Sequence, residues 1–390
     1  MNKLIFTLAF ILTGASAFAQ TFTFNQGGPT VKNYYTELPY QNIYGKLVVT
    51  VELGGSKHRF LFDTGAPVAL SKQLAAQINA KTMHVGVIND ANGAADSTTI
   101  VGIDDIRLGD VIFSGIPALV LLPDMYKCWN VEGVVGSNML RNSIVSIVAD
   151  RQVIIITDEP DKLILNKKYS VPLVLDANNN HQSDPVIKVF INKVSAFMAF
   201  DSGQSAFMRF TDDYMNQLSK LNACQVVDKG YGASQIGAFG LQANADKFLV
   251  GVASLNIGRA RFDNITAETN KTGNSAFGTK LLDYGNVTLD FIHGKFYFDP
   301  RTETTNLAEK HWPFSPTMQG NKLVVGVVWQ KGASLVKPGE QITAINGKDY
   351  SEVSLCDMLN NKPPLAGYET GTITIKDAGG QLRNVQIVKE

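Results

Sequence analysis

The chain has 390 residues, with 35 Lys and Arg against 35 Asp and Glu, and 45% of its residues are hydrophobic. This balance leaves no net charge to attract nucleic acid or an anionic membrane, and the apolar fraction is ample for buried cores. Neither the three cysteines nor the five histidines have the spacing of a metal site, and no Gly-rich phosphate loop of the usual form is present. We therefore expect no metal, no cofactor, no nucleic acid partner and at most one disulfide.

Residues 1–19 are typical of a secretory signal peptide. One basic residue, Lys3, precedes an apolar run of about ten residues, and Ala17-Phe18-Ala19 forms a small-x-small cleavage site. The alternative is a buried helix at the N-terminus. No later segment approaches the roughly eighteen unbroken apolar residues of a membrane helix. We therefore expect an exported chain, periplasmic or extracellular, with no membrane span.

A hairpin in the first fifth of the chain leads into an acidic residue. Residues 46–53 alternate in polarity, Gly54-Gly55 makes a turn, and residues 58–62 run into Asp63-Thr64-Gly65, after which apolar residues resume. Apolar residues on both sides draw this carboxylate toward the interior, where its desolvation is expensive. The glycine allows a tight turn, and its N–H and the neighbouring hydroxyl can hydrogen-bond the carboxylate.

The rest of this first repeat (residues 46–156) reads as short β-strands with two short helical segments. Asn92-Gly93 is a strong hairpin signal, and the mostly polar strands around it, within residues 83–103, are expected to project from the body. The other expected elements are a helical segment at 71–78 capped by Ser71, strands at 105–108 and 116–122, the run 133–136 leading into a short helix, and a hairpin of 143–148 with 151–156.

The same order recurs in a second repeat (residues 186–298). Strands at 186–191 and 196–200 run into Asp201-Ser202-Gly203, again between apolar runs. The expected elements that follow are a helical segment at 211–221, a glycine-rich segment at 230–240 in the place of the projecting hairpin, a strand at 253–257, the run 275–282 and a hairpin of 287–291 with 295–298. From Asp63 to Gly136 is 136 − 63 = 73 positions, and from Asp201 to Gly278 is 278 − 201 = 77. Such an internal repeat is unlike a chance turn.

Two such turns that face each other would bring two carboxyl groups into one site. Like charges that close cannot both ionise, so the pair holds one proton and offers an acid and a base together. The alternative is that each triplet is an ordinary turn at the end of a strand, since Asp, Ser and Gly are common turn residues. Two copies in matching apolar surroundings favour the paired site.

These residues resemble the aspartic peptidases, with the Asp-Thr-Gly and Asp-Ser-Gly triplets of the retropepsin and pepsin-like families. The resemblance spans roughly residues 40–300 and implies an all-β, bilobal acid protease fold, with lobes at 20–168 and 169–302. It implies that Asp63 and Asp201 are catalytic. Thr64 and Ser202 would hydrogen-bond across the interface, and Gly65 and Gly203 would let the carboxylates become coplanar.

The resemblance also implies that the hairpin at Asn92 and Gly93 is a flap that closes over a substrate. The sequence departs from the pepsin-like pattern at Gln204, where a small hydroxyl residue is usual, and the first triplet is followed by Ala66, as in the retroviral type. No residue matches the flap tyrosine of pepsin, because Tyr231 lies in the second repeat.

Residues 303–316 are polar and turn-rich and are expected to be a linker to a small domain at 317–390. The run 337–347, Lys-Pro-Gly-Glu-Gln-Ile-Thr-Ala-Ile-Asn-Gly, resembles the core motif of PDZ domains, with Glu340 where Asp is usual. The resemblance implies a PDZ-like α+β domain that binds a C-terminal peptide as an added strand. The expected elements are strands at 323–329, 341–345, 372–375 and 385–388 and a helical segment at 353–359. The alternative is a small β-rich domain that only packs on the lobes.

The resulting prediction is a secreted, monomeric aspartic endopeptidase that hydrolyses peptide bonds of a peptide or protein substrate. One alternative is a catalytically silent peptidase fold that binds peptides through its cleft and PDZ-like domain. The departure at Gln204 is the feature that supports this alternative. A second alternative is a structural β-protein of the cell surface in which the repeat is only architectural.

Overall fold

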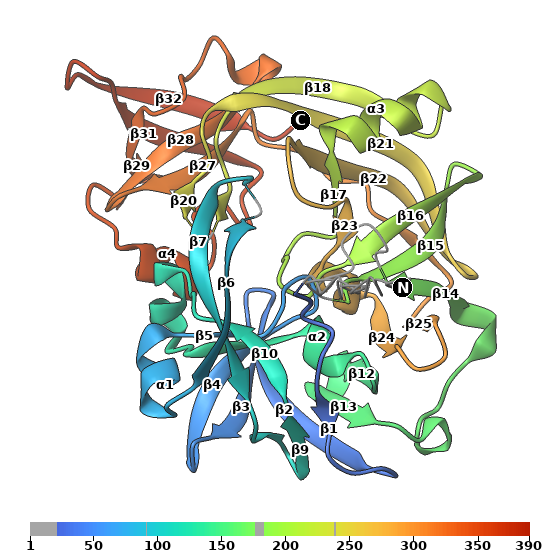
Figure 1. Cartoon of the computed structure of the whole chain (residues 1–390). Helices are drawn as coiled ribbons and strands as arrows, with labels where there is room; N and C mark the ends of the chain where they lie inside the picture. Colours follow the sequence, from blue (N-terminus) through green and yellow to red (C-terminus); the bar gives the residue numbers. More distant parts are fainter. Residues whose placement is uncertain (1–21, 91, 176–182, 238) are drawn as a thin grey trace, which may run out of the picture.

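The computed structural model describes residues 22–90, 92–175, 183–237 and 239–390, and it is mostly β (Figure 1). The expected signal peptide at 1–19 lies outside the described residues. The strand pairings join every described strand except the short β19–β20 hairpin into one network that closes as a barrel. Helices are short, and none in the described ranges is long and apolar enough to cross a membrane.

In the first repeat, β3 (Lys46–Leu53) and β4 (Ser56–Asp63) form the expected hairpin, and Asp63 is the last residue of β4. The body of this hairpin is fixed by alternation, because every second side chain of β3 from Leu47 to Leu53 points into the core. β4 runs parallel to β11 (Gly133–Gly136), and helix α2 (Ser137–Leu140) follows β11. The other elements here are β1 (Gly28–Pro29), β2 (Tyr35–Ile43), β5 (Ala69–Leu70), α1 (Lys72–Gln77), β6 (Lys81–Asn89), β7 (Ala95–Ile103), β8 (Ile106–Leu108), β9 (Val111–Ser114), β10 (Ile116–Leu119) and the 3-10 helix η1 (Asp124–Trp129).

The second repeat builds the same arrangement. β15 (Pro185–Ile191) and β16 (Val194–Phe200) form a hairpin that ends next to Asp201, and β16 runs parallel to β23 (Ala276–Phe277). Helix α3 (Asp212–Lys220) begins after Thr211, whose hydroxyl accepts a hydrogen bond from the Tyr214 N–H as an N-cap. The remaining elements are β17 (Met208–Thr211), β18 (Gln225–Gly232), β19 (Ile236–Gly237), β20 (Gly240–Leu241), β21 (Ala245–Ile257), β22 (Ala260–Asn270) and η5 (Thr279–Asp283).

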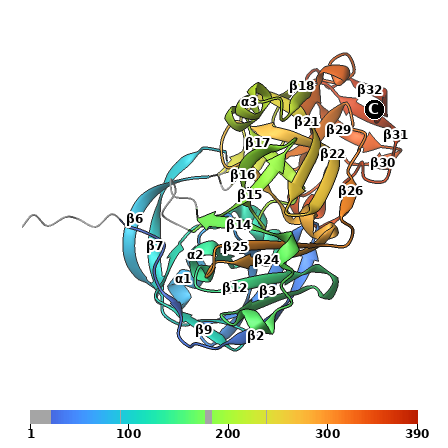
Figure 2. The ribbon, with the colours of Figure 1, turned by 90° about the vertical axis from the view of Figure 1, so that its right-hand side faces the viewer.

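One antiparallel sheet connects the two repeats. β12 (Ile144–Val148) of the first repeat pairs with β24 (Gly285–Asp290) of the second, and the buried hydroxyls of Ser146 and Thr288 lie 2.8 Å apart across this pair. Figure 2 shows β12, β24, β25 and β14 at the level between the repeats. The strands of this sheet, in order of pairing, are β2, β13 (Val153–Thr157), β12 (Ile144–Val148), β24 (Gly285–Asp290), β25 (Lys295–Pro300) and β14 (Ser170–Leu175), with short 3-10 turns η2 (Ala149–Arg151), η3 (Pro160–Lys162) and η4 (Lys167–Tyr169) between some of them.

A single apolar core extends through both repeats. Phe62 and Phe200, the residues just before the two acidic residues, belong to it, as do Met139 and Leu281 from the helices after β11 and β23. All four side chains are fully buried. The strands that carry the two triplets are therefore held in place by shared packing.

The C-terminal unit (residues 314–388) has an apolar core of its own, which includes Phe314, Leu323, Ile342 and Ile373. Four of its strands and its helix lie close to the expected positions, and two further strands, at 314–319 and 348–349, were not predicted. Its elements are β27 (Phe314–Gln319), β28 (Lys322–Trp329), β29 (Gln341–Ile345), β30 (Lys348–Asp349), β31 (Thr370–Lys376), β32 (Leu382–Val388), the 3-10 turn η6 (Gln330–Gly332) and helix α4 (Leu355–Asn360).

The segment expected to be a linker is only partly irregular. β26 (Thr304–Asn306) pairs with β22, and β27 already begins at Phe314. Phe314 is 1% exposed and pairs with Val328, so burial of this ring draws the segment into the sheet. Pro316 is tolerated inside the strand because the pairing shifts its register between Ser315 and Pro316.

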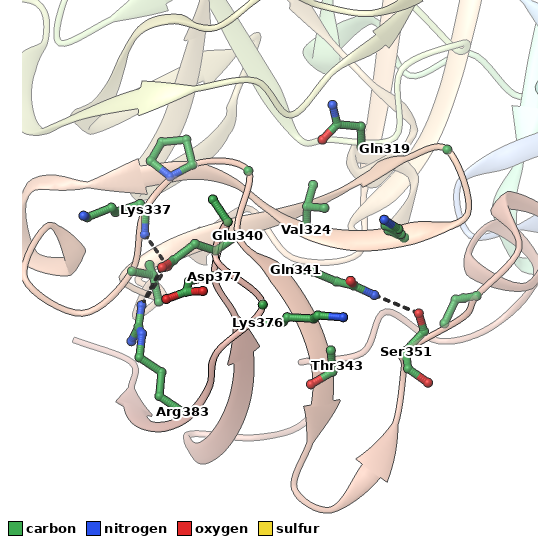
Figure 3. A pocket seen from close by; sticks show the side chains of 18 of the residues that line it. Gln319, Val324, Lys337, Glu340, Gln341, Thr343, Ser351, Lys376, Asp377 and Arg383 are labelled. Carbon is green, nitrogen blue, oxygen red and sulfur yellow. Dashed lines mark hydrogen bonds and ion pairs between the residues drawn. The ribbon is translucent and has the colours of Figure 1, made fainter.

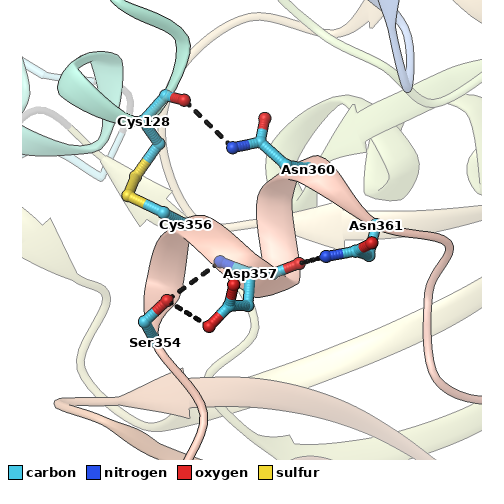
Figure 4. Close-up of a disulfide and its surroundings, with 6 residues drawn as sticks. All are labelled: Cys128, Ser354, Cys356, Asp357, Asn360 and Asn361. Carbon is cyan, nitrogen blue, oxygen red and sulfur yellow. Dashed lines mark hydrogen bonds between the residues drawn. A yellow bond between two sulfur atoms is a disulfide. The ribbon is translucent and has the colours of Figure 1, made fainter.

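The C-terminal unit is fastened to both repeats. β18 of the second repeat pairs with β28, with Tyr231 opposite Val328. A disulfide joins Cys128 in η1 to Cys356 in α4 across 228 positions of sequence, and the Asn360 side chain donates a hydrogen bond to the Cys128 carbonyl (Figure 4). The third cysteine, Cys224, is free and buried.

Candidate active site

The two triplets meet between the repeats and hydrogen-bond each other reciprocally. The Thr64 hydroxyl donates to the Phe200 carbonyl at 2.7 Å and accepts from the Ser202 N–H at 3.1 Å. In the mirrored arrangement, the Ser202 hydroxyl donates to the Phe62 carbonyl at 2.9 Å and accepts from the Thr64 N–H at 3.0 Å. Both hydroxyl residues are fully buried. The four hydrogen bonds fix the two turns relative to each other.

This contact places the Asp63 and Asp201 carboxyl groups together. Each is held by its own turn, because the Gly65 N–H donates to Asp63 Oδ1 at 2.9 Å and the Gly203 N–H donates to Asp201 Oδ1 at 2.8 Å. Only glycine fits at these two positions. A Cβ on Gly65 would lie 2.5 Å from Asp201 Cγ, and a Cβ on Gly203 would overlap the Asp63 carboxylate.

The surroundings of the Asp63 carboxyl, Asp201 among them, shift its pKa. Burial raises the pKa of the Asp63 carboxyl, and the negative charge of Asp201 raises it further, while the Lys46 ammonium and the Gly65 N–H oppose the rise. A hydrogen bond with the Asp201 side chain adds to the rise. These effects favour the protonated form of the Asp63 carboxyl, and the titration belongs to the pair as a whole.

Both turns are braced by the strand and helix that follow in their repeat. In the first repeat, the Ser137 N–H donates to the Ala66 carbonyl at 3.0 Å, and the Asn138 side chain accepts from the Val68 N–H at 2.8 Å. In the second repeat, the Thr279 N–H donates to the Gln204 carbonyl at 2.8 Å. These braces are the segments that the internal repeat singled out.

Gln204, the main departure from the pepsin-like pattern, is buried and used structurally. Its side-chain amide donates to the Ala276 carbonyl at 3.2 Å, so the longer side chain is tied to the strand beside the second triplet. Gln204 therefore has a structural contact to β23, and the Gly203 N–H still donates to the Asp201 carboxylate beside it.

A cavity of 790 Å³ contains both carboxyl groups. The first repeat lines it mainly with apolar side chains, among them Ala69, Leu119, Tyr126 and Trp129, whereas the second repeat adds Arg209 and Glu268. Within the described residues, no three His, Cys, Asp or Glu side chains gather to hold a metal ion. A larger groove of 2080 Å³ lies on the C-terminal unit, contains neither carboxyl group, and is lined in part by Glu340 and Arg383, which pair with each other (Figure 3).

The hairpin of β6 and β7, with Asn92 and Gly93 at its turn, reaches the second repeat. The Asp90 carboxylate accepts from the Phe239 N–H at 3.1 Å, and the Asn92 side chain donates to the Gly240 carbonyl at 3.2 Å. Ile88, Asn89 and Asp90 line the cavity. In Figure 1 the hairpin rises from the first repeat to β20. Its tip therefore spans the cavity that holds the carboxyl groups.

Three residues near the carboxyl pair were not anticipated from the sequence. Lys46 donates a hydrogen bond to the Gly203 carbonyl, and burial lowers the pKa of its ammonium while Asp63 and Asp201 oppose this. Burial raises the pKa of the Tyr126 hydroxyl, and the two carboxyl groups add to this. The third is Arg209. Each lies in an ordinary strand or turn pattern, so no local signal in the sequence marks them.

The family model described as aspartyl protease matches residues 49–139. This range includes the first triplet, the β6–β7 hairpin and the brace after β11. The chain therefore contains a domain of the aspartic peptidase type. No curated protein matches the chain.

Two solved structures illustrate how distant the structural similarity is. Basic 7S globulin from soybean is 12% identical, with a TM-score of 0.39, and the match covers 70% of this chain and 96% of that one. A retropepsin-like aspartic protease from Rickettsia conorii is 18% identical, with a TM-score of 0.25, and the match covers 32% of this chain and 92% of that one.

Proposed function

We propose that this protein is an aspartic endopeptidase with a bilobal, pepsin-like arrangement in which each repeat forms one lobe. The observation that carries the proposal is the meeting of two Asp-[Thr/Ser]-Gly turns, locked by the reciprocal hydrogen bonds of Thr64 and Ser202. The family match to aspartyl proteases supports the same class of reaction. The lobes would be 20–168 and 169–302, as predicted from the sequence.

In the proposed mechanism, Asp63 and Asp201 share one proton. The ionised carboxylate takes a proton from a water molecule, whose oxygen attacks the peptide carbonyl carbon, and the protonated carboxyl gives its proton to the carbonyl oxygen. Collapse of the tetrahedral intermediate breaks the C–N bond. One hydroxyl of the intermediate returns its proton to the pair, and the amine leaves with a proton from the pair, which restores the single shared proton. The β6–β7 hairpin acts as the flap that covers the substrate and excludes other water.

The C-terminal unit is proposed to be a PDZ-like domain at 317–390 that binds a peptide C-terminus. Its support is the motif at 337–347 and the edge of β27, which pairs with β28 alone among the described strands. A strand with one unpaired edge can accept an extended peptide as an added strand. The alternative that this domain only packs on the lobes predicts no binding of such peptides.

We also propose that the protein is exported and acts as a monomer in the periplasm or outside the cell. The Cys128–Cys356 disulfide supports an oxidising compartment, because disulfides are rare in reducing cytosol. One chain supplies both triplets, so no second copy is needed to complete the pair.

The test compares the wild-type protein with Asp63→Asn and Asp201→Asn on a mixture of unfolded proteins between pH 3 and pH 8. Each variant should lose cleavage by roughly 100-fold to 10,000-fold, since it removes general acid–base catalysis, while circular dichroism shows an unchanged fold. Retained cleavage in either variant would rule out the shared-proton mechanism.

If the folded wild-type protein cleaves nothing at any pH, the silent peptide-binding alternative takes its place. Binding of a statine-type transition-state mimic separates that alternative from a purely structural β-protein, which would bind none.

A further inference from the structure

We propose that Arg209 selects an acidic side chain of the substrate close to the scissile bond. This inference rests on the proposed peptidase function and adds a substrate class to it. The selectivity would come from a guanidinium that lies in the cleft of the carboxyl pair and makes no hydrogen bond or ion pair with any residue that the structure describes.

The place of Arg209 follows from strand register. Phe200, the residue just before Asp201, pairs with Phe277 of β23. Arg209 of β17 pairs with Ala276, one residue before Phe277. In β5 of the first repeat, Ala69 pairs with Val134, which holds the same position relative to Phe62. Ala69 and Arg209 are therefore equivalent, and both line the cavity that contains the carboxyl groups. The second repeat thus places a cation where the first has a methyl group.

Arg209 lies where a substrate must pass. It lines the 790 Å³ cavity and an adjoining cavity of 1010 Å³, and Asp201 lines both as well. The adjoining cavity is also lined by His84 and Asn89 of the β6–β7 hairpin. A peptide held between the hairpin and the carboxyl pair would therefore bring one of its side chains to the guanidinium.

The guanidinium is not neutralised by a direct contact with a carboxylate in the part of the chain that the structure describes. It makes no hydrogen bond and no ion pair there, although it is only partly exposed. Burial lowers the pKa of Arg209, against the opposing charges of Asp201 and Glu268, which is the sign of an incompletely solvated cation. A guanidinium has five N–H donors in a fork that matches a carboxylate. A substrate carboxylate would satisfy donors that the protein leaves open.

Glu268, opposite Arg209 in the β17–β22 pair, could instead favour a basic side chain. Three observations argue against this. Burial raises the pKa of the Glu268 carboxyl, which disfavours its charged form, and its Oε1 already accepts a hydrogen bond from Ser315 at 3.5 Å. The buried Lys247 ammonium also acts on Glu268. In addition, the Lys46 ammonium is close enough to interact with Arg209, so a second positive charge disfavours a basic side chain here.

The opposite wall completes the expected preference. Leu119, Tyr126 and Trp129 line the cavity from the first repeat, with Ala69 at the position equivalent to Arg209. Such a wall suits an apolar side chain, because it gains burial and loses no hydrogen bond. The substrate class is therefore a peptide with an acidic residue on one side of the scissile bond and an apolar residue on the other.

The experiment maps the cleavage sites of the wild-type protein in a peptide mixture by mass spectrometry, and then compares synthetic peptides that carry Glu, Gln or Lys at the enriched position. We expect Asp and Glu at one fixed position within a few residues of the cut, and kcat/KM for the Glu peptide above that for the Gln peptide by roughly 10-fold to 100-fold. In Arg209→Gln this ratio should fall to near one, and Arg209→Lys should retain part of it. Arg259→Gln, in the exposed turn between β21 and β22, is the matched control and should keep the full ratio.

A wild-type preference for Lys or Arg, no preference for any charge, or an unchanged ratio in Arg209→Gln would overturn the proposal. If the wild-type protein cleaves nothing, peptides that carry Glu, Gln or Lys at successive positions of one apolar sequence are tested for binding to the wild-type protein and to Arg209→Gln by fluorescence anisotropy. Tighter binding of the Glu peptide that is lost in Arg209→Gln would uphold the acidic preference while the peptidase function fails. Equal binding of the Glu, Gln and Lys peptides would overturn it.

Discussion

The two repeats share the turn that carries the carboxyl group but differ in what surrounds that turn. β6 pairs with β7 and reaches over the cavity, whereas β18, in the corresponding place of the second repeat, pairs with β21 on one side and β28 on the other. Val48 and Val186 hold equivalent positions, because each pairs with the residue that lies two before the acidic residue of its repeat. Two residues before these valines, the first repeat has Lys46 and the second has the buried Asp184. The two repeats are thus alike in the turns that bring the carboxyl groups together. They differ in the strands and charges around these turns, so the two sides of the cleft are not equivalent.

The largest expected effect breaks the shared part of this comparison. In Gly203→Ala, the added Cβ would overlap the Asp63 carboxylate and push the pair apart. We expect kcat/KM to fall by roughly 100-fold or more, since a displacement of about 1 Å at reacting groups costs that much. Gly65→Ala should cause a similar loss, because its Cβ meets Asp201. Gly379→Ala is the control, because this site is exposed and an added Cβ would lie 3.4 Å from Asp377 Oδ1, an ordinary van der Waals distance. A normal rate in Gly203→Ala would contradict the symmetric arrangement.

The second prediction concerns the way in which each repeat holds the C-terminal unit. Cys356→Ser removes the covalent link to η1, whereas the β18–β28 pairing to the second repeat remains. We expect the free energy of unfolding to fall by about 2–5 kcal/mol, measured by urea denaturation. Activity should fall as well, because Tyr126 and Trp129 of η1 line the cavity. A reductant should change the wild-type protein and Cys224→Ala in the same way and leave Cys356→Ser unchanged.

The third prediction tests the charge difference between Lys46 and Asp184. The Lys46 ammonium lowers the pKa of Asp63 against the rise that burial and Asp201 cause. Without this cation the pair binds its protons more tightly, so the pH–rate profile of Lys46→Met should move to higher pH, by on the order of one unit. Lys46→Arg should keep the wild-type profile. A shift to lower pH would show that the ammonium does not stabilise the ionised pair.

The smallest expected effect concerns the hairpin tip. Asp90→Ala removes the acceptor for the Phe239 N–H across the cavity, as well as those for two N–H groups in its own turn. We expect KM to rise by about five-fold with little change in kcat, since a typical hydrogen bond contributes about 1 kcal/mol. Asp96→Ala, which removes only a local bond to the Ser97 N–H, should leave KM unchanged. An unaltered KM in Asp90→Ala would mean that the hairpin does not contribute to substrate binding.

Local pattern was sufficient to predict the hairpins and the turns. The alternation of 46–53, the turn at Gly54-Gly55 and the Ser71 cap all appear where they were expected, because each depends on residues close in sequence. β21 was predicted only over 253–257 but begins at Ala245. Its inner half contains the fully buried Lys247, whose ammonium donates to Gln242, Thr269 and Asn270. From the sequence alone, a lysine is expected at the surface, and the hydrogen-bond acceptors that allow Lys247 to be buried include Thr269 and Asn270 of another strand.

The residues around the carboxyl pair could not be predicted, because contacts between distant parts of the chain bring them into the cleft. Lys46 and Arg209 lie in the cleft only because two hairpins 138 positions apart face each other, as the bond between the Thr64 N–H and the Ser202 hydroxyl shows. The pairing of Cys128 with Cys356 could not be predicted for the same reason. β27 was not predicted, because residues 303–316 are polar and turn-rich, whereas burial of the Phe314 ring draws this segment into the sheet.

The Cys128–Cys356 link has a consequence for the order of events in biosynthesis. A ribosome adds Cys356 only 228 residues after Cys128, when both acidic triplets have long been complete. The wall that contains Tyr126 and Trp129 therefore cannot be covalently fixed until the last part of the chain has been made and α4 has folded. Translation thus builds a delay between the appearance of the two carboxyl groups and the locking of the cleft around them. A nascent chain that stops short of Cys356 would carry the complete pair of triplets but never this lock.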